Sequence, residues 1–379
     1  MRGKTWDIFC NVVDNFGDAG VCWRLARQLA TEHDLAVRLW VDDLYALSRL
    51  CPEIDVSLDE QAQRGVRVRH WATPFPQVDV ADVVVEAFAC ELPDSYLAAM
   101  AARSAKPAWI NLEYLSAEDW VSRCHGLASP HPSLALTKYF FFPGFGAGRG
   151  GLLREASLVE QRDACQARPA AAWHDLALPP PDPGETSVSM FCYENPALPR
   201  LLHAWAEGDT PLRCLIPEGK ALLQVAAFLG DSPFQVGDKI KRGNLTLCAL
   251  PFLSQENYDR LLWSCGLNFV RGEDSLVRAQ WAARPLVWHI YPQGRDAHIP
   301  KLEAFLARYC EGLPLQAASA CRDFWMAWNR GAGSAAIAAW PAFWRVQGDL
   351  RAHARHWSER LCGQVDMASQ LVLFCETLL

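Results

Sequence analysis

Leu178-Pro179-Pro180-Pro181-Asp182-Pro183-Gly184 interrupts the 379-residue sequence near its middle. Four prolines in seven residues exclude a helix or a central strand, because proline lacks the backbone N–H and its ring fixes φ. We therefore predict that residues 178–184 link two folded domains. A chain of this length exceeds one compact core of ordinary size, whereas two domains fit it well.

The sequence before this linker alternates short apolar runs with helical patterns. A loop over 14–20 and a helix over 21–30 follow the first apolar run. Strands are predicted at residues 6–13, 36–41, 66–71, 81–88, 108–112 and 135–142. Continuous apolar runs separated by helices are typical of a parallel sheet that is covered on both faces.

The same alternation starts again after the linker. Strands are predicted at residues 187–193, 212–216, 245–250, 267–270 and 286–291. We therefore predict an α/β protein with two Rossmann-like domains, over residues 1–177 and 185–360, facing each other across a cleft. This is the GT-B layout, and a C-terminal helix over about residues 361–379 is expected to pack back on the first domain. Some two-domain binding proteins and epimerases share the layout, so the pattern alone does not decide the function.

Composition excludes several classes of protein. The net charge is −7 and there is no run of Lys and Arg, so we expect no nucleic-acid partner. The fourteen cysteines form no CxxC pair, and several lie inside apolar runs, which is typical of reduced thiols in a cytoplasmic protein. Asp7 interrupts the apolar N-terminal stretch, and no run reaches the roughly 20 residues needed to cross a bilayer, so we expect neither signal peptide nor membrane partner.

The loop over residues 14–20, with the sequence DNFGDAG, carries the first candidate site. In open α/β sheets ligands bind beyond the carboxyl ends of the strands, and this loop presents Asp14 and Asp18 there. It is not GxGxxG, so the dinucleotide fingerprint is absent. A plain alternative for Asp18 is that it caps the following helix.

The segment Arg271-Gly272-Glu273-Asp274-Ser275 carries the second candidate site, because it ends a strand and opens a helix. Free backbone N–H groups and the helix dipole favour a phosphate there, and Arg271 would add positive charge. We expect Asp274 and Ser275 to offer backbone N–H groups, and Glu273 to point to a sugar or a cationic acceptor. The alternative is that Asp274 or Ser275 is an N-cap.

Aromatic residues follow other strands of the second domain. Phe191, Tyr193, Phe252 and Tyr291 could stack a nucleotide base, with Gln255 reading its polar edge. Any one of them is more often a core residue than a ligand contact, but four at one predicted sheet edge favour binding.

The sequence indicates neither a P-loop nor a metal site. The glycine-rich segment 143–151 lacks the lysine and the spacing of a P-loop, so we expect a flexible loop. No DxD motif is present and the ten histidines lack metal-ligand spacing, so we expect no metal ion.

Three stretches resemble the EarP family, the elongation factor P arginine rhamnosyltransferases. They are residues 6–18 (WDIFC running into VDNFGD), residues 191–195 (FCYEN) and residues 269–293, which contain FVRGEDS, RAQW and WHIYPQ. The resemblance extends over essentially the whole chain. Two departures are a missing threonine within residues 146–150 and Ala283, where the family carries glycine.

The resemblance implies an inverting GT-B enzyme that transfers L-rhamnose from TDP-β-L-rhamnose to an arginine of elongation factor P, which then rescues ribosomes stalled at polyproline. It implies Asp18 as general base, Asp14 as a support and Glu273 as a second essential carboxylate, without a cofactor. The implied donor-site residues are Asn15, Phe16, Gly17, Phe191, Tyr193, Phe252, Leu253, Gln255, Arg271, Gly272, Asp274, Ser275 and Tyr291.

Two alternatives stay open at this point. A GT-B enzyme could use another nucleotide sugar or another acceptor, and a non-catalytic sensor could bind a nucleotide sugar only. Carboxylates in both domains count against the sensor, because an anion-binding module would not need them. In the first domain Asn111, Glu113 and Tyr114 are candidates for contact with a protein acceptor.

Overall fold

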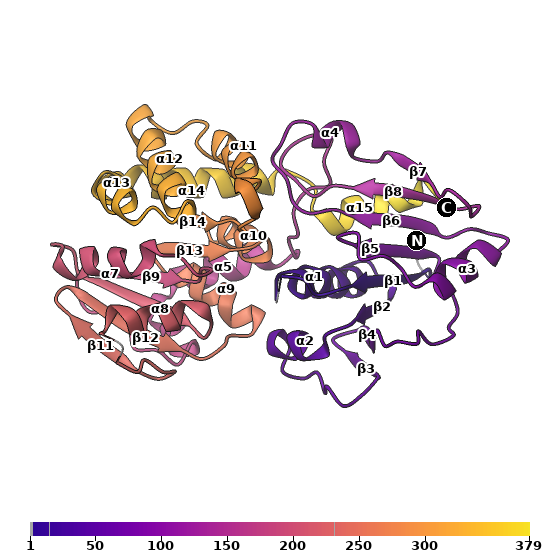
Figure 1. The fold of residues 1–379 in the computed structure, drawn as a ribbon, viewed down its shortest axis with the longest axis horizontal. Helices are drawn as coiled ribbons and strands as arrows, with labels where there is room; N and C mark the ends of the chain where they lie inside the picture. The colour runs from indigo at the N-terminus through magenta and orange to yellow at the C-terminus, as the bar shows by residue number, and fades with distance from the viewer. Residues whose placement is uncertain (1–2, 15, 231) are drawn as a thin grey trace. The chain divides into compact units, whose positions relative to one another are not determined.

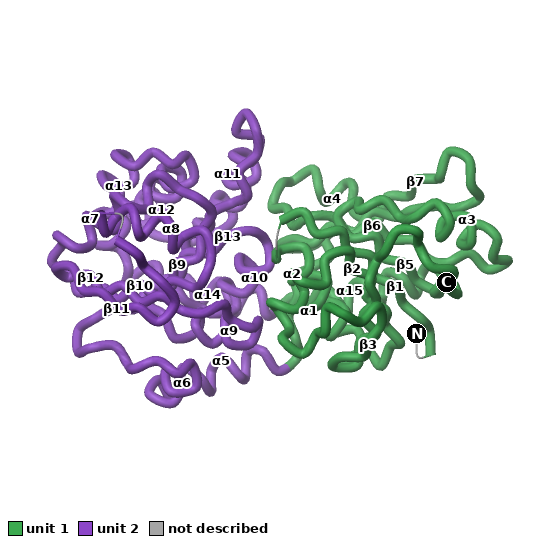
Figure 2. The backbone as a smooth tube through the Cα atoms, turned by 60° about the horizontal axis from the view of Figure 1, so that its bottom comes forward, with its two compact units in different colours: residues 1–156, 363–379 green, residues 157–362 purple. Residues whose placement is uncertain are grey.

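The computed structural model describes residues 3–14, 16–230 and 232–379. The chain forms two compact units, each an α/β domain on a mainly parallel sheet, which confirms the predicted fold class. Unit 1 contains Met1–Ala156 and Gly363–Leu379, and unit 2 contains Ser157–Cys362 (Figure 2).

Unit 1 is built on an eight-stranded sheet of order β3-β4-β2-β1-β5-β6-β8-β7 (Figure 1). Only the edge pairs β3–β4 and β7–β8 are antiparallel. The strands are β1 (Thr5–Cys10), β2 (Ala36–Val41), β3 (Glu60–Gln63), β4 (Val66–His70), β5 (Val83–Ala87), β6 (Ala108–Leu112), β7 (Ala128–Pro130) and β8 (Thr137–Phe141). The helices are α1 (Gly17–Glu32), α2 (Leu44–Leu50), α3 (Asp94–Ala102), α4 (Val121–Cys124) and α15 (Met367–Glu376).

The two faces of strand β1 pack against different helices. Trp6 and Ile8 lie in one hydrophobic cluster with α1 and with Leu371 of the C-terminal helix α15. Phe9 points to the other face, where it belongs to a second cluster with Tyr96 of α3. Side chains alternate along a strand, so both faces of the sheet are covered, and α15 belongs to the core of unit 1.

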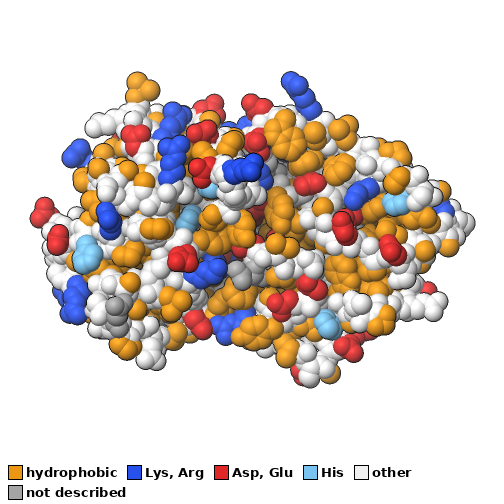
Figure 3. Space-filling view, viewed as in Figure 1, with side chains coloured by type: hydrophobic (Ala, Val, Ile, Leu, Met, Phe, Trp, Pro, Cys, Tyr) orange, Lys and Arg blue, Asp and Glu red, His pale blue; other side chains and the backbone are white. Residues whose placement is uncertain are grey.

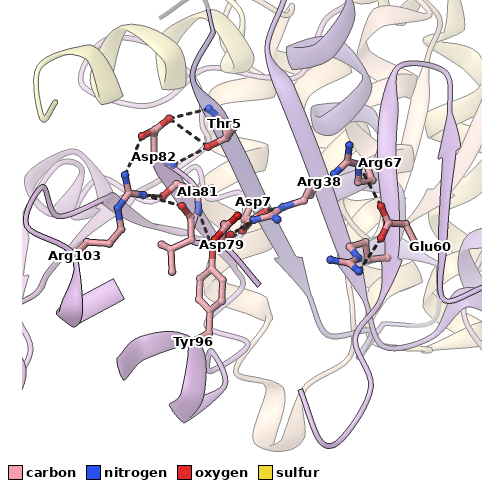
Figure 4. Close-up of polar contacts among 12 residues, drawn as sticks. Thr5, Asp7, Arg38, Glu60, Arg67, Asp79, Ala81, Asp82, Tyr96 and Arg103 are labelled. Atoms are coloured by element: carbon pink, nitrogen blue, oxygen red, sulfur yellow. Dashed lines mark hydrogen bonds and ion pairs between the residues drawn. The ribbon is translucent and has the colours of Figure 1, made fainter. Parts of the chain in front are cut away.

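A buried ionic network braces the amino ends of the central strands (Figure 4). The carboxylate of Asp7 is fully buried and accepts hydrogen bonds of 2.6 Å from Nε and of 2.6 Å from Nη2 of Arg38. The Tyr96 hydroxyl donates to the same carboxylate. Each charge is paired, as burial requires. Because ligands bind at the opposite, carboxyl ends in open α/β sheets, we assign this network to stability.

Unit 2 is built on a six-stranded sheet of order β11-β12-β10-β9-β13-β14, in which only β11–β12 is antiparallel. The strands are β9 (Thr186–Met190), β10 (Leu212–Pro217), β11 (Lys239–Arg242), β12 (Leu245–Leu250), β13 (Leu267–Arg271) and β14 (Leu286–His289). The helices are α5 (Leu158–Ala167), α6 (Pro169–Asp175), α7 (Ala197–Glu207), α8 (Lys220–Phe228), α9 (Gln255–Ser264), α10 (Asp274–Trp281), the 3₁₀ helix η1 (Gly294–Asp296), α11 (Ile299–Tyr309), α12 (Leu315–Asn329), α13 (Gly333–Arg345) and α14 (Gln347–Cys362).

The proline-rich segment 178–184 is part of unit 2 and does not separate the units, which differs from the predicted boundary. Helix α6 precedes this segment, and its Trp173 is buried in a hydrophobic cluster with Leu215 of β10. The guanidinium of Arg213 lies 4.4 Å from the centre of the Trp173 ring, and its Nη1 donates to the Pro179 carbonyl at 2.7 Å. These contacts attach the segment to the sheet of unit 2, so the chain passes between units at residues 156–157 and 362–363.

The first strand is shorter than predicted, and the first helix begins earlier. Strand β1 ends at Cys10 and α1 begins at Gly17, not near residue 21. Asp42 binds the segment that follows β1. Its carboxylate accepts hydrogen bonds from the Val12 N–H at 2.9 Å and from Nδ2 of the Asn11 side chain at 2.6 Å. For the backbone N–H of Val12, a carboxylate therefore replaces a neighbouring strand as the hydrogen-bond partner.

The surface mixes charges of both signs. On the face drawn in Figure 3, acidic and basic side chains are interspersed with apolar ones. Within the described ranges, no helix is both long and apolar enough to span a bilayer.

Candidate active site

The loop after β1 places two carboxylates at the carboxyl edge of the unit 1 sheet. The Gly17 N–H donates to the Asp14 carbonyl at 2.7 Å, which closes a tight turn before α1. A Cβ atom at Gly17 would lie 3.0 Å from Oδ2 of Asp14. Glycine therefore lets the Asp14 carboxylate pack against the turn. Phe16 is half-buried at the N-cap of α1, and Asn15 lies outside the described residues.

Asp18 holds this loop and does not cap the helix. Its side chain is 3% exposed, and its Oδ2 accepts from the N–H of Val13 and from that of Asp14, each at 2.9 Å. The N-cap position, Phe16, has no side-chain cap hydrogen bond. The alternative that Asp18 is a helix cap is therefore wrong.

The surroundings of Asp18 raise its pKa above the ordinary value. Burial is the largest cause, and the neighbouring charge of Asp14 acts in the same direction. Hydrogen bonds from the two backbone N–H groups and from the side chain of Tyr114 lower the pKa and offset part of the effect. A buried carboxylate with a raised pKa is a stronger proton acceptor than an exposed one.

In unit 2, the turn between β13 and α10 forms the second candidate site. Gly272 has φ of +63°, a conformation that favours glycine, and its carbonyl accepts from Nε1 of Trp288 at 2.8 Å. The N-cap is Glu273, and it makes no side-chain cap hydrogen bond. Oγ of Ser275 accepts from the Arg271 N–H at 3.1 Å and donates to the Arg271 carbonyl. Ser275 is therefore not the cap, and Asp274 is the first helical residue.

Arg271 is a buried cation held between two aromatic rings. Its guanidinium carbon lies 4.5 Å from the centre of the Phe191 ring and 4.7 Å from that of Tyr193. The side chain is 9% exposed, and its Nη1 has no hydrogen-bond partner among the described residues. A buried donor without a partner is costly, so this atom indicates a ligand acceptor. Next to the start of α10, that ligand would be an anion.

The aromatic residues predicted to bind the base gather around Arg271. Tyr193 is buried, and its ring centre lies 5.4 Å from that of Tyr291, which is 45% exposed. Phe191 packs edge-on against Tyr258 at 5.5 Å. Phe191, Tyr193 and Tyr291, three of the four aromatic residues predicted to stack a base, therefore form one cluster with Arg271, and their binding of a base stays a prediction.

The remaining predicted donor residues follow β12. Gln255 is 2% exposed and is the first residue of α9, and Phe252 is half-buried. Leu253 packs against the hydrophobic cluster that contains Trp173 and Leu261, so its side chain serves the core.

Two further residues of unit 2 had no role in the sequence prediction. His289 ends β14, and its ring centre lies 5.4 Å from that of Tyr193. Burial and the positive charge of Arg271 lower the pKa of His289 to about 3, so its imidazole is neutral. Arg278 of α10 holds both carboxylate oxygens of Asp259 in α9, at 2.9 and 2.7 Å. Arg278 lies in the motif RAQW and His289 in the motif WHIYPQ, but only the folded structure shows which residues they contact.

The glycine-rich segment 143–151 is packed, which corrects the expectation of a flexible loop. Arg149 is buried, and its Nη1 and Nη2 donate to the carbonyls of Phe145 and Glu118 at 3.0 and 3.1 Å. A Cβ atom at Gly144 would lie 2.6 Å from Cδ of Arg149. Glycine is thus required here by close packing. In the parts of the chain that the structure describes, no group of three or more His, Cys, Asp and Glu could hold a metal ion.

Comparison with known proteins identifies the family. The family model described as "Elongation-Factor P (EF-P) rhamnosyltransferase EarP" matches residues 6–376. A protein-arginine rhamnosyltransferase of Pseudomonas putida is 52% identical over 377 residues, which cover 98% of each chain. A solved structure described as "Structural basis for EarP-mediated arginine glycosylation of translation elongation factor EF-P" has a TM-score of 0.70 and 39% identity, and the match covers 99% of this chain and 100% of that chain.

A more distant structure supports the fold alone. UGT2 of Phytolacca americana, solved with UDP-2-fluoro-glucose and pterostilbene, has a TM-score of 0.51 at 10% identity and covers 99% of both chains. The two α/β units therefore form the GT-B fold. The chain belongs to the EarP family of elongation factor P rhamnosyltransferases and is a glycosyltransferase.

Proposed function

We propose that this enzyme transfers L-rhamnose from TDP-β-L-rhamnose to an arginine side chain of elongation factor P (EF-P), with inversion at the anomeric carbon. The names of its relatives support the sugar and the acceptor. The observation that carries the donor assignment is the buried, unpartnered Nη1 of Arg271 beside the start of α10. The modified factor would act in the cytoplasm, on ribosomes stalled at polyproline.

In this proposal unit 2 binds the donor. Arg271 and the backbone N–H groups of Asp274 and Ser275 hold the diphosphate, and Gly272 lets the backbone approach it. They also stabilise the negative charge that grows on the leaving diphosphate, without the help of a metal ion. The thymine base stacks on Tyr291, the exposed aromatic residue of the cluster, with Phe252, Gln255 and the backbone of Leu253 beside it. Asn15, Phe16 and Gly17 would contact the sugar side of the donor.

The acceptor chemistry limits what the carboxylates can do. An arginine guanidinium has a pKa of about 13.8. Removing its proton at pH 7 would cost roughly 9 kcal/mol, at about 1.36 kcal/mol per pH unit. Proton transfer must therefore accompany C–N bond formation, when the attacking nitrogen becomes far more acidic.

We assign the proton acceptor to Asp18, with Asp14 and Glu273 holding the guanidinium through charge-assisted hydrogen bonds. The nitrogen attacks the anomeric carbon from the face opposite the diphosphate, so the C–N bond forms while the C–O bond to phosphate breaks. The proton moves to Asp18, the bonding electrons leave with TDP, and the configuration inverts. The raised pKa of Asp18 suits this role, because it strengthens the carboxylate as a base.

The test is the intact mass of EF-P after incubation with the enzyme and TDP-β-L-rhamnose. We expect a gain of one deoxyhexose, located on an arginine, and a product of α configuration by NMR. Asp18→Asn should bind donor and fail to transfer it, and Glu273→Gln should do the same if it acts on the acceptor. Asp59→Asn, at a carboxylate that is 96% exposed in unit 1, is the control. No gain in mass, or normal transfer by Asp18→Asn, would contradict the proposal.

A further inference from the structure

We propose that Phe88 is a positioning residue for transfer: its ring holds Tyr114 in place, and Tyr114 in turn orients the carboxylate of Asp18. This inference rests on the proposed role of Asp18 as the base. All three residues belong to unit 1, at the carboxyl edge of one sheet: Phe88 follows β5, Tyr114 follows β6, and Asp18 lies in the first turn of α1, after β1.

The turn after β5 has an unusual backbone. Phe88, Ala89 and Glu91 have φ of 56°, 54° and 55°, in the left-handed region that residues with a Cβ atom rarely adopt. Three such residues within four positions persist only where their surroundings hold them, and they cluster at functional sites. One restraint is the Phe88 N–H, which donates to the Leu112 carbonyl at the end of β6, at 2.7 Å.

A second restraint is the buried carboxylate of Glu86 at the end of β5. It accepts from the Glu91 N–H at 3.3 Å, from Nε1 of Trp109 at 3.0 Å and from Nζ of Lys138 at 3.2 Å. Glu86 is 2% exposed, and its charge is paired with Lys138. The left-handed turn is therefore fixed to the middle of the sheet and not simply left strained at the surface.

This turn presents the Phe88 ring to Tyr114. The two ring centres are 4.4 Å apart and the planes differ by 15°, so the rings are stacked. Both side chains are half-buried. The Tyr114 side chain hydrogen-bonds to Asp18, in addition to the backbone N–H groups of Val13 and Asp14 that Asp18 already accepts.

The chemical consequence concerns the charge state of Asp18. A hydroxyl that donates to a carboxylate favours the ionised form, and only the ionised form can accept a proton from the acceptor. The other titratable groups that act on Asp18 are the Asp14 carboxylate and the Cys10 thiol, which also faces Asp42. None of these donates to Asp18 as Tyr114 does. Loss of the Tyr114 bond should therefore leave more Asp18 protonated at a given pH.

A purely structural role for Phe88 makes a different prediction. Phe88 also packs against the main hydrophobic cluster of unit 1, so its loss must cost some stability. Loss of stability alone would lower the amount of active enzyme equally at every pH. A change confined to acid pH distinguishes positioning from packing.

The experiment measures kcat for transfer to EF-P between pH 5 and 9, with donor affinity measured separately. For Tyr114→Phe and Phe88→Ala we expect kcat to fall about tenfold at the acid end, since a hydrogen bond to a charged group is lost, and to approach the wild-type value at the alkaline end. Phe88→Tyr keeps a ring to stack and should keep the wild-type profile. Affinity for TDP-β-L-rhamnose should not change in any of these variants.

Two further variants keep the test decisive. Phe88→Leu retains apolar bulk without a flat ring, and it replaces Phe88→Ala if the latter does not fold. Phe75→Ala removes another half-buried ring of unit 1, which packs on Phe9 and Trp40, and should leave the pH profile unchanged. A wild-type profile for Phe88→Ala or Phe88→Leu beside a displaced one for Tyr114→Phe would overturn this inference alone. An equal displacement of the pH profile in Phe75→Ala would also overturn the inference about Phe88. If the wild-type enzyme transferred no rhamnose, the proposed function would fail together with this inference.

Discussion

The guanidinium carbon of Arg271 lies 4.5 Å from the centre of the Phe191 ring. A second ring, that of Tyr193, lies 4.7 Å from the same carbon, so the cation is stacked and largely removed from water. A guanidinium tolerates such an environment better than an ammonium does, because it is planar and weakly hydrated. The charge next to α10 is therefore fixed in place before a ligand binds.

Replacing Arg271 with lysine should weaken donor binding although the charge is kept. Lysine cannot stack on Phe191 and offers no planar fork, so we expect the affinity for TDP to fall about tenfold or more. Isothermal titration calorimetry measures it. Arg213→Lys is the matched control, because Arg213 stacks on Trp173 elsewhere in unit 2. It should lose stability and keep affinity, and equal affinities for Arg271→Lys and the wild type would contradict the assignment.

The ion pair between Arg278 and Asp259 should contribute strongly to stability. Both side chains are buried, and two hydrogen bonds join them, so removing one partner leaves an uncompensated buried charge. We expect Asp259→Ala to lower the free energy of unfolding by about 3–5 kcal/mol, measured in urea. Glu311→Ala breaks the more exposed pair with Arg360, at 3.7 Å, and should cost about 1 kcal/mol or less. Similar losses in both variants would show that α10 is not braced in this way.

The central strands of both sheets and the edge strand β14 were predicted from the sequence, whereas the other edge strands were not. The strands β1, β5, β9 and β13 are buried along almost their whole length, because helices cover both faces of the sheet, although β9 (TSVSM) and β13 (LNFVR) also contain polar residues. The edge strands β3, β7 and β11 are short and partly exposed, with sequences EQAQ, ASP and KIKR, and they carry no such signal. Their pairing depends on the neighbouring strand and not on their own residues.

The site was predictable where it is local in sequence. Residues 271–275 form one turn, so the motif alone indicates an anion site. The contact of Tyr114 with Asp18, and that of His289 with Tyr193, join segments far apart in the chain, and no periodicity reports them. The domain boundary was misplaced for the same reason, since proline marks an irregular segment but not the unit on which that segment packs.

His289 should make stability depend on pH. Because its pKa in the folded protein is about 3, the unfolded chain binds a proton below pH 6.5 and the folded chain does not. The contribution of neutral His289 to the free energy of unfolding is therefore fully present above pH 6.5 and is lost as the pH falls below that value. Between pH 7 and pH 5, His289→Gln should lose about 2 kcal/mol less than the wild type in urea denaturation. His174→Gln, at a side chain that is 91% exposed, should behave as the wild type, and parallel losses in all three proteins would contradict the prediction.

Replacing Ala283 with glycine should stabilise the protein. The φ angle of Ala283 is 52°, just after the end of α10, where glycine ends helices without a steric penalty. We expect Ala283→Gly to raise the free energy of unfolding by about 1 kcal/mol. The preceding Ala282 has φ of −64°, so Ala282→Gly should lower the free energy of unfolding by about 1 kcal/mol. If Ala283→Gly and Ala282→Gly changed the free energy of unfolding in the same direction, a conformational cause would be excluded.

Asp18→Asn should remove activity and preserve stability. The raised pKa of Asp18 means that the folded protein favours the neutral form, so ionised Asp18 lowers stability above its pKa, and that cost disappears as the pH falls through it. Asparagine is neutral, and its carbonyl oxygen can still accept from the N–H groups of Val13 and Asp14. At pH 7 the variant should be at least as stable as the wild type in urea, and this difference should shrink toward pH 4.

The transfer activity of Asp18→Asn should fall, although its stability does not. Loss of a general base lowers the transfer rate by about 10²–10⁴-fold, measured by the mass of EF-P under single-turnover conditions. A variant that is much less stable than the wild type at pH 7 would mean that the charge of Asp18 serves the loop after β1. Full activity would instead place the base elsewhere, because the amide of asparagine cannot accept the proton.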